Sequence, residues 1–260
     1  MKCVIVAAGM STRLRPLTDR LPKCLLSVGG KTILDRMITS LVHADITNIS
    51  IVVGFEAERI RTFLKQQFPD RRFKLILNPN FATTNNAYSL LLAGDFFLDS
   101  RVRTKMHDRL LVLDSDILFH PALLASLRPN NEENKIAVRV QGVHDNEEVG
   151  VVIDEFGNIS KIGKGFDREK IYGESIGMEC FNYASAKLLF EVLRRRIKKE
   201  ERRAEYYEIT FQEMIDRGCA IKATDIGDYP AIEVDSFADL EIAERTIVPK
   251  IDTASDVRIQ

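Results

Sequence analysis

The sequence of 260 residues lacks the features that mark several classes of protein. It contains no tryptophan, and none of its apolar runs approaches the roughly 18 residues that a membrane-spanning helix requires. Its four cysteines lie far apart, without the paired spacing of a zinc site or the density of a disulfide framework. The apolar run near the start stops at Gly9, too early for a secretory signal. We therefore expect a cytoplasmic protein with no membrane span.

The chain also lacks an excess of charge of either sign. It has 37 basic and 38 acidic residues, which give a formal net charge of −1 at pH 7. Proteins that bind nucleic acid generally need a basic surface to neutralise phosphates, so this balance argues against a nucleic-acid partner. At about 150 residues per domain, the length allows one or two domains.

The first half of the chain contains short apolar runs that alternate with helical patterns. Buried strands that alternate with helices are typical of βαβ units. The pattern predicts an α/β fold of Rossmann-like type, with a mixed, mostly parallel sheet flanked by helices. Strands are predicted over residues 2–8, 48–53, 74–77 and 110–113, and helices over residues 32–44, 56–67 and 85–97.

The second half is richer in strands and less regular. No linker-like stretch interrupts the chain, so we expect one domain over residues 1–247, followed by a tail, 248–260, to which we assign no role. Strands are predicted over residues 135–141, 149–153, 159–162, 175–181 and 220–224, and helices over residues 184–203 and 206–217 and from a cap at Ser236 to residue 245.

The loop after the first strand combines small residues with two cations. Small residues let backbone N–H groups approach phosphate oxygens, and Arg13 and Lys23 would add positive charge. The loop matches neither the G-x-G-x-x-G fingerprint nor the P-loop pattern, so from its residues alone a phosphate site and an ordinary surface loop both remain open. The residues before Arg13 are Ala7, Ala8, Gly9, Met10, Ser11 and Thr12.

Two acidic pairs follow apolar stretches. Asp114 and Asp116 end the strand at 110–113, and their i, i+2 spacing places both on one face of it. Open α/β sheets bind ligands at the carboxyl ends of their strands, and carboxylate oxygens suit magnesium. Glu233 and Asp235 form the second pair. For one such pair alone, a turn with helix capping is the simpler interpretation.

Residues 4–23 resemble the signature of the sugar-phosphate nucleotidyltransferases, A-A-G-x-x-x-R followed by P-K. The resemblance implies that residues 7–12 wrap the triphosphate of a nucleotide, and that Arg13 and Lys23 stabilise the departing pyrophosphate. It also implies a nucleotide-binding half over about residues 1–130 and an acceptor-binding half over about residues 131–247.

The segment 85–89, N-N-A-Y-S, resembles the branch of cytidylyltransferases that act on choline phosphate and 2-aminoethylphosphonate. The resemblance implies CTP as the nucleotide, with Asn78, Asn85, Asn86 and Ala87 at its base and sugar. An asparagine that caps a helix is an equally sound physical interpretation of this segment, and the two are compatible.

The same resemblance implies a magnesium ion on Asp116 and Asp235, with Asp114 beside the nucleotide. For the acceptor it implies Lys164 at the phosphate and, around the rest of the molecule, Glu174, Tyr207, Glu208 and Glu233. Tyr206 and Tyr207 also fit an amphipathic helix, so we expect one of the two to be a core residue.

An aromatic face favours a quaternary ammonium, whereas a carboxylate favours a primary ammonium that donates hydrogen bonds. Val149 and Ala231 stand where choline-binding tryptophans are expected, which weakens choline as the acceptor.

The sequence therefore predicts a magnesium-dependent cytidylyltransferase that transfers CMP to a small phosphate or phosphonate, of the phosphocholine or 2-aminoethylphosphonate type. Two alternatives remain open: a hexose-1-phosphate nucleotidyltransferase that makes an NDP-sugar, and a non-catalytic nucleotide-binding regulatory protein. The sequence is also compatible with a protein that forms a homodimer and with a chain that is one module of a longer protein.

Overall fold

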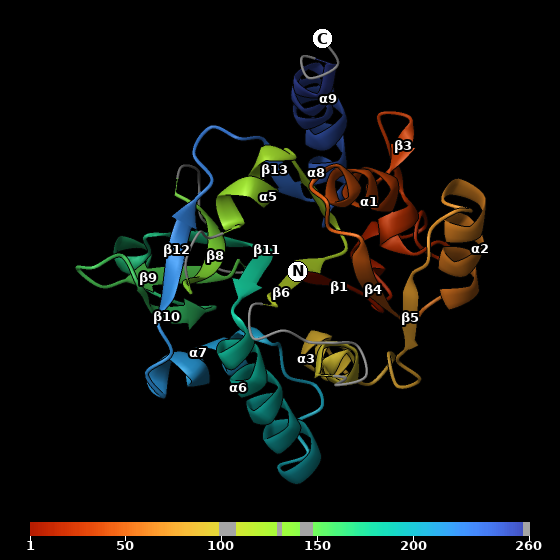
Figure 1. Cartoon of the computed structure of the whole chain (residues 1–260). Coiled ribbons are helices and arrows are strands. Elements are labelled where there is room, and N and C mark those ends of the chain that lie inside the picture. Colours follow the sequence, from red (N-terminus) through yellow and green to blue (C-terminus); the bar gives the residue numbers. More distant parts are fainter. Residues whose placement is uncertain (99–107, 129–131, 141–147, 257–260) are drawn as a thin grey trace.

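The computed structural model describes residues 1–98, 108–128, 132–140 and 148–256, and within them a nine-stranded sheet crosses the molecule (Figure 1). Seven strands follow the order β10-β9-β11-β6-β1-β4-β5, and β8 pairs with β11 and β12. Their bounds are β1 Lys2–Ala7, β4 Asn48–Val53, β5 Lys74–Leu77, β6 Leu110–Asp114, β8 Asn134–Arg139, β9 Gly150–Ile153, β10 Ile159–Gly163, β11 Gly173–Phe181 and β12 Ile221–Asp225.

The first half of the chain builds the parallel part of the sheet. β1 pairs in parallel with β4 and β6, and β4 pairs in parallel with β5. Every residue of β1 is buried, as expected for a strand covered on both faces. β11 runs antiparallel to β6, β8 and β9, so the second half makes the sheet mixed. The predicted α/β fold is confirmed.

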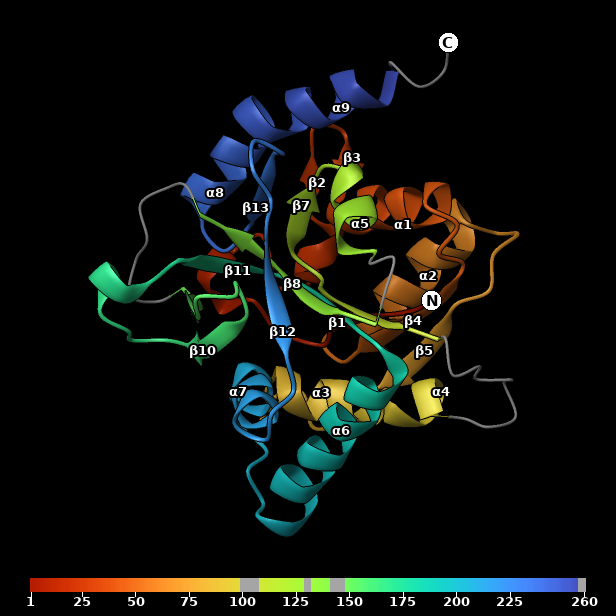
Figure 2. The same ribbon diagram turned by 60° about the vertical axis from the view of Figure 1, so that its left-hand side comes forward.

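Helices cover both faces of the sheet (Figure 2). One face packs against α1 and α2, and apolar residues of α5 join the same core cluster. The opposite face packs against residues of α3, α4, α6 and α7. The bounds are α1 Ile33–His43, α2 Ala57–Gln67, α3 Asn86–Leu92, α4 Gly94–Leu98, α5 Ala122–Leu127, α6 Tyr183–Arg194 and α7 Glu208–Asp216.

Several predicted elements have different ends in the structure. The helix predicted over 85–97 is divided into α3 and α4, and that predicted over 184–203 ends at Arg194 and continues as a π-helical turn, η4, Arg195–Lys199. The charged run after Arg194 buries only Ile197 in this turn, so it offers little apolar surface to extend the helix. α7 begins at Glu208, later than predicted. Gln141, predicted in a strand, lies outside the described residues.

Short elements beside the sheet complete the fold. Strand β7, Ile117–Phe119, pairs with β13, Ala231–Glu233, and this pairing brings the two acidic pairs of the sequence together. A hairpin of β2, Ser27–Val28, and β3, Lys31–Thr32, precedes α1. The sequence patterns did not predict β2, β3, β7 or α5, because these elements are too short to show a period.

The C-terminal helices pack beneath the loop that follows β1. Ser236 caps α8, Phe237–Ile242, as predicted, and π-helical η5, Ala243–Ile247, and α9, Val248–Asp256, follow it. Val248 and Ile251, from the tail without an assigned role, lie in one core cluster with Leu14 and Val234. This cluster therefore supports both the loop and the strand end next to Asp235. Residues 257–260 lie outside the described part of the chain. Among the described residues, no helix is long and apolar enough to cross a membrane.

Candidate active site

A cavity opens at the carboxyl ends of β1 and β6, the usual ligand-binding edge of such a sheet. Both halves of the chain contribute to its wall. The structure places there most of the site residues predicted from the sequence: Ala7, Ala8, Gly9, Ser11, Arg13, Lys23, Asn78, Asn85, Asn86, Asp114, Asp116, Lys164, Glu208, Glu233 and Asp235.

The loop after β1 packs against buried residues on one side and faces the cavity on the other. Leu14 is fully buried beneath it, and the Thr18 hydroxyl donates to the carbonyl oxygen of Ser11 at 2.7 Å. Ser11 has a φ of 49°, in the left-handed region. A Cβ atom added to Gly9 would meet nothing within 4 Å. The loop backbone therefore has free space in front of it for a ligand.

Lys23 joins the two acidic pairs at the centre of the cavity. Its side chain is only 7% exposed, and its Nζ contacts Asp116 Oδ2 at 2.6 Å and also contacts Asp235 Oδ1. Arg13 Nη2 lies 2.9 Å from Asp235 Oδ2. Burial alone would raise the pKa of Asp235, but Lys23 and Arg13 outweigh burial and hold this pKa below its ordinary value. Burial lowers the pKa of Lys23, and the two carboxylates more than compensate and raise it.

The carboxylates of Asp116 and Asp235 fit a magnesium ion. Both contact one ammonium group, so both lie within reach of a single cation. Magnesium usually takes one or two carboxylates and completes its shell with water and substrate phosphates. In the described ranges no group of three or more acidic, histidine or cysteine side chains is arranged to hold a metal, so a metal here would depend on such additional ligands.

A second group of carboxylates lies deeper, and its members carry raised pKa values. Burial is the main cause for Asp114, Glu179, Glu208 and Glu233, and mutual repulsion adds to it for all but Glu208. The pKa of Glu208 rises to about 7. One oxygen each of Glu179 and Glu208 is buried without a hydrogen-bond partner among the described residues. Glu208 can therefore bind a proton near neutral pH, and the unpartnered oxygens of Glu179 and Glu208 can accept hydrogen bonds.

Glu179 and Gly177 were not predicted from the sequence. Glu179 belongs to this acidic group, although it does not line the cavity. Gly177 lines the cavity with a φ of 67°, and a Cβ there would lie 2.8 Å from Asp114 Oδ2. A side chain at this position would therefore displace Asp114. The glycine-rich segment 173–177 was the only signal of this close approach in the sequence.

Five predicted residues do not line the cavity. Tyr207 is 1% exposed, packs against Phe211 with tilted rings whose centroids are 5.0 Å apart, and donates its hydroxyl hydrogen to Asp114 Oδ2 at 2.6 Å. It is thus the core residue expected of the tyrosine pair, and Tyr206 lines the cavity instead. Ala87 and Glu174 are buried elsewhere, and Met10 and Thr12 lie outside the cavity wall.

The asparagines stabilise the local backbone. Asn85 Oδ1 caps α3 by accepting from the N–H of Asn86 at 2.9 Å, and Asn86 Oδ1 accepts from the N–H of Tyr207 at 2.9 Å. Asn78 Nδ2 donates to Ser89 Oγ at 3.0 Å. The capping interpretation is confirmed, and the same contacts tie the start of α3 to the segment before α7. A role in reading the base stays a hypothesis.

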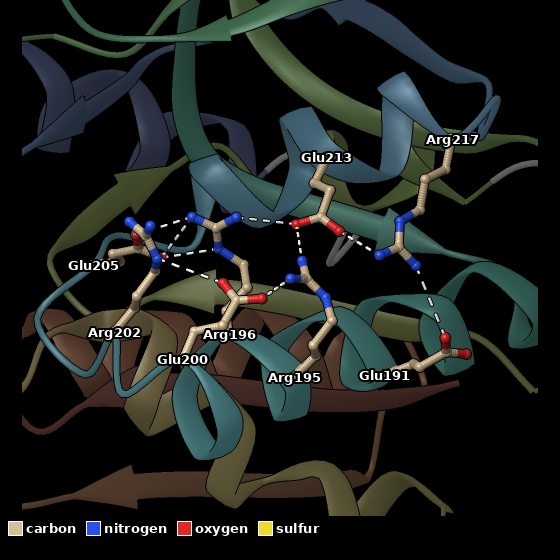
Figure 3. A network of polar contacts seen from close by, with 8 residues as sticks. All are labelled: Glu191, Arg195, Arg196, Glu200, Arg202, Glu205, Glu213 and Arg217. Carbon is tan, nitrogen blue, oxygen red and sulfur yellow. Dashed lines mark hydrogen bonds and ion pairs between the residues drawn. The ribbon is translucent and has the colours of Figure 1, made fainter.

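A network of arginines and glutamates holds the segment before α7 (Figure 3). The guanidinium of Arg196 donates to both oxygens of Glu205 at 2.9 Å and to Glu213 at 3.0 Å. Arg195 also contacts Glu213. Because bidentate pairs restrict orientation, the network fixes residues 205–208 against the end of α6. This segment carries Tyr206 and Glu208 to the cavity.

The chain belongs to the nucleotidyl transferase family, whose model matches residues 2–221. It is 31% identical to the 2-aminoethylphosphonate cytidylyltransferase of Lancefieldella rimae, over 72% of this chain and 69% of that protein. It is 29% identical to the bifunctional IPC transferase and DIPP synthase of Aquifex aeolicus, over 94% of this chain and 51% of that protein. Six of the curated relatives, the Aquifex aeolicus protein included, are matched over only 20% to 51% of their own length.

The fold is also that of solved cytidylyltransferases. The CTP:phosphocholine cytidylyltransferase of Streptococcus pneumoniae superposes with a TM-score of 0.76 at 22% identity, over 94% of this chain and 97% of that chain. The predicted membership of the nucleotidyltransferases, with likeness to the choline-phosphate and 2-aminoethylphosphonate cytidylyltransferases, is confirmed.

Proposed function

We propose that the protein is a magnesium-dependent cytidylyltransferase, which transfers CMP from CTP to a small phosphate or phosphonate and releases pyrophosphate. The observation that carries the proposal is the contact of Lys23 with both Asp116 and Asp235, next to Arg13 and in front of an open loop. The names of the similar proteins support cytidine as the base and a phosphonate or phosphate as the acceptor.

The reaction needs positioning and charge rather than a protein nucleophile. An oxygen of the acceptor attacks the α-phosphorus of CTP, the bond from this phosphorus to the bridging oxygen breaks, and pyrophosphate departs with that oxygen. Arg13 and Lys23 stabilise the charge that develops on the leaving group. For this, Lys23 exchanges its carboxylate partners for phosphate oxygens when the nucleotide binds.

Asp116 and Asp235 are the residues that would hold magnesium in this mechanism. When bound, magnesium supplies charge stabilisation to phosphate oxygens as a Lewis acid. Lys23 keeps the two carboxylates together before the ion arrives, which limits their repulsion.

The acceptor end of the cavity favours an ammonium group that donates hydrogen bonds. Lys164 and Glu208 line this end, and an oxygen of Glu208 is buried without a partner in the described structure. Val149 lines the same wall, while Ala231 does not. With no tryptophan in the chain, a cage for a quaternary ammonium would depend on tyrosine and phenylalanine alone. We therefore favour 2-aminoethylphosphonate over phosphocholine.

A pyrophosphate-release assay tests the proposal. CTP, UTP, GTP and dTTP are each combined with magnesium and with 2-aminoethylphosphonate, phosphocholine, phosphoethanolamine, inositol-1-phosphate or a hexose-1-phosphate. We expect release with CTP and an amino-phosphonate. Release with another nucleotide and a hexose-1-phosphate would instead favour the NDP-sugar alternative. CTP binding without release with any acceptor would favour the regulatory one.

The variant Lys23→Ala tests the site itself. We expect its turnover to fall by about 100- to 1000-fold, because the charge on the leaving pyrophosphate loses a partner. The exposed Lys65→Ala on α2 is the matched control and keeps wild-type turnover. Wild-type turnover in Lys23→Ala, with thermal unfolding unchanged, would remove Lys23 from the mechanism.

A further inference from the structure

A second cavity adjoins the candidate active site between β10 and α7. It shares four lining residues with the first cavity, Val149, Lys164, Tyr206 and Glu208. The two spaces are therefore separated only by the side chains that line the acceptor end. The second cavity continues past Glu208, away from the loop after β1.

The wall of this second cavity is largely apolar. Ile162, Phe166 and Ile209 line it together with the ring of Tyr206. Ile209 is 41% exposed and Tyr206 is 47% exposed, so two large apolar surfaces face solvent side by side. Single exposed apolar residues are common, but several in a concave site with a polar border are typical of ligand pockets.

Hydrogen bonds hold α7 against β10 and occupy several polar side chains of the cavity wall. α7 packs beside β10 (Figure 2). Gln212 on α7 accepts from the N–H of Ile162 at 2.9 Å and donates to the carbonyl oxygen of Ser160 at 3.3 Å. Glu213 is held by Arg196 in the network of Figure 3. An apolar group can therefore enter without breaking these hydrogen bonds, which lowers the cost of binding it.

Glu208 stands at the junction of the two cavities. Its buried Oε2 atom lacks a hydrogen-bond partner among the described residues, and Lys164, whose Nζ lies 5.2 Å from the ring centroid of Tyr206, borders the same junction. An acceptor bound through its phosphonate near Lys164 would bring its ammonium group to Glu208. A substituent on that nitrogen would then point toward the apolar cavity.

We propose that the acceptor is an N-substituted aminoalkyl phosphate or phosphonate, whose apolar substituent lies in this second cavity. The inference rests on the proposed function and extends it to a class of acceptor larger than 2-aminoethylphosphonate. A secondary ammonium keeps two N–H donors, one for Glu208, so the substituent adds apolar contact without removing the polar one.

The test is a series of 2-aminoethylphosphonates that carry hydrogen, methyl, propyl or benzyl on nitrogen, assayed with CTP and magnesium. Burial of each methylene group is expected to raise kcat/KM by roughly two- to fourfold, so the propyl compound should exceed the methyl compound by about tenfold. The measured quantity is the ratio of kcat/KM between the propyl and the unsubstituted acceptor.

Two matched variants connect this ratio to the cavity. Ile209→Asp places a charge in the apolar wall and should reduce the ratio to about one, whereas Ile242→Asp, at a residue 47% exposed on α8, should leave it at the wild-type value. If Ile209→Asp does not fold by circular dichroism, Ile209→Ala serves in its place and should lower the ratio partially.

The outcomes separate this inference from the function on which it rests. Turnover of the unsubstituted acceptor with a propyl ratio at or below one overturns the inference and leaves the proposed function standing. An equal ratio in the wild type and in the folded Ile209 variant also overturns it, because the substituent then lies elsewhere. No pyrophosphate with any acceptor overturns the proposed function, and this inference with it.

Discussion

The candidate active site contains two groups of carboxylates that behave differently. Asp116 and Asp235 are partly exposed and share Lys23, and Lys23 and Arg13 lower the pKa of Asp235. In the deeper group, represented by Glu208, burial is the main influence and raises the pKa. The same kind of side chain thus carries a negative charge in one place and binds a proton near neutral pH in the other. Neighbouring charge and solvent, rather than residue type, therefore determine what a carboxylate can do.

This difference suggests separate roles for the two groups of carboxylates in the cavity. Lys23 and Arg13 favour the charged form of Asp235, and under the proposed function the outer group would exchange an ammonium for a magnesium ion. Under the same proposal, the deeper group would accept hydrogen bonds from the acceptor and distinguish acceptors by their donors. Substitutions in the outer group, Asp116 and Asp235, should therefore affect turnover. Substitutions in the deeper group should affect the pH dependence of stability and stability itself.

The largest effect is expected for Asp235→Asn. This change keeps the size of the side chain but removes one of the two charges that would hold the metal, so turnover should fall by about 100- to 1000-fold. Steady-state pyrophosphate release measures it, and Asp70→Asn, at an exposed position, is the control. Turnover within a few-fold of wild type would show that the outer group is not the metal site.

A smaller effect, on pH dependence, is expected for Glu208→Gln. The pKa of Glu208 is about 7 in the folded protein and 4.5 ordinarily, so the folded state binds more protons than the unfolded state between these values. Stability from this group is therefore lost as pH rises from 4.5 to 7, by on the order of 3 kcal/mol. Glu208→Gln should remove that loss.

Urea unfolding at pH 5 and pH 8 checks this expectation. The wild-type protein should lose more free energy of unfolding between the two values than Glu208→Gln, while the exposed Glu58→Gln should follow the wild type. Identical pH profiles for wild type and Glu208→Gln would mean that Glu208 is as solvated as an ordinary surface carboxylate.

The smallest effect is expected for Tyr207→Phe, which removes the hydrogen bond from Tyr207 to Asp114, a member of the deeper group. The Tyr207 hydroxyl donates to Asp114 at 2.6 Å in a buried setting, so its removal should lower the free energy of unfolding by about 1–2 kcal/mol. Tyr206→Phe, next in sequence but 47% exposed, should change stability by less than about 0.5 kcal/mol. Equal effects for the two variants would contradict the structural distinction between them.

Local patterns in the sequence predicted the parallel half of the sheet well. β4 and β5 have the predicted bounds, and β1 and β6 differ from prediction by one residue at one end. Buried parallel strands are continuous apolar runs, so their burial is visible in the sequence itself. β7 and α5 could not be predicted in this way, because each is too short to have a detectable period.

In the candidate site, too, some residues could be predicted from the sequence and others could not. Asp114 and Asp116 were recognisable because they end a predicted strand, and Arg13 and Lys23 because the segment around them resembles the nucleotidyltransferase signature. The depth of Glu179 could not be predicted, since it depends on β11 lying between β6 and β8. Nor could the sequence distinguish Tyr207 from Tyr206, because only the position of α7 against the sheet decides which of the two is buried.

Local apolar patterns and short motifs were therefore sufficient to predict the α/β fold, the membership of the nucleotidyl transferases and most residues around the cavity. The directions in which the carboxylate pKa values shift and the presence of a second apolar cavity became visible only in the folded structure. Both depend on burial and on neighbours distant in the chain, as when Lys23 meets Asp235. The missing tryptophan in the sequence argues against choline, and the structure places Val149, Tyr206 and Glu208 in the cavity wall.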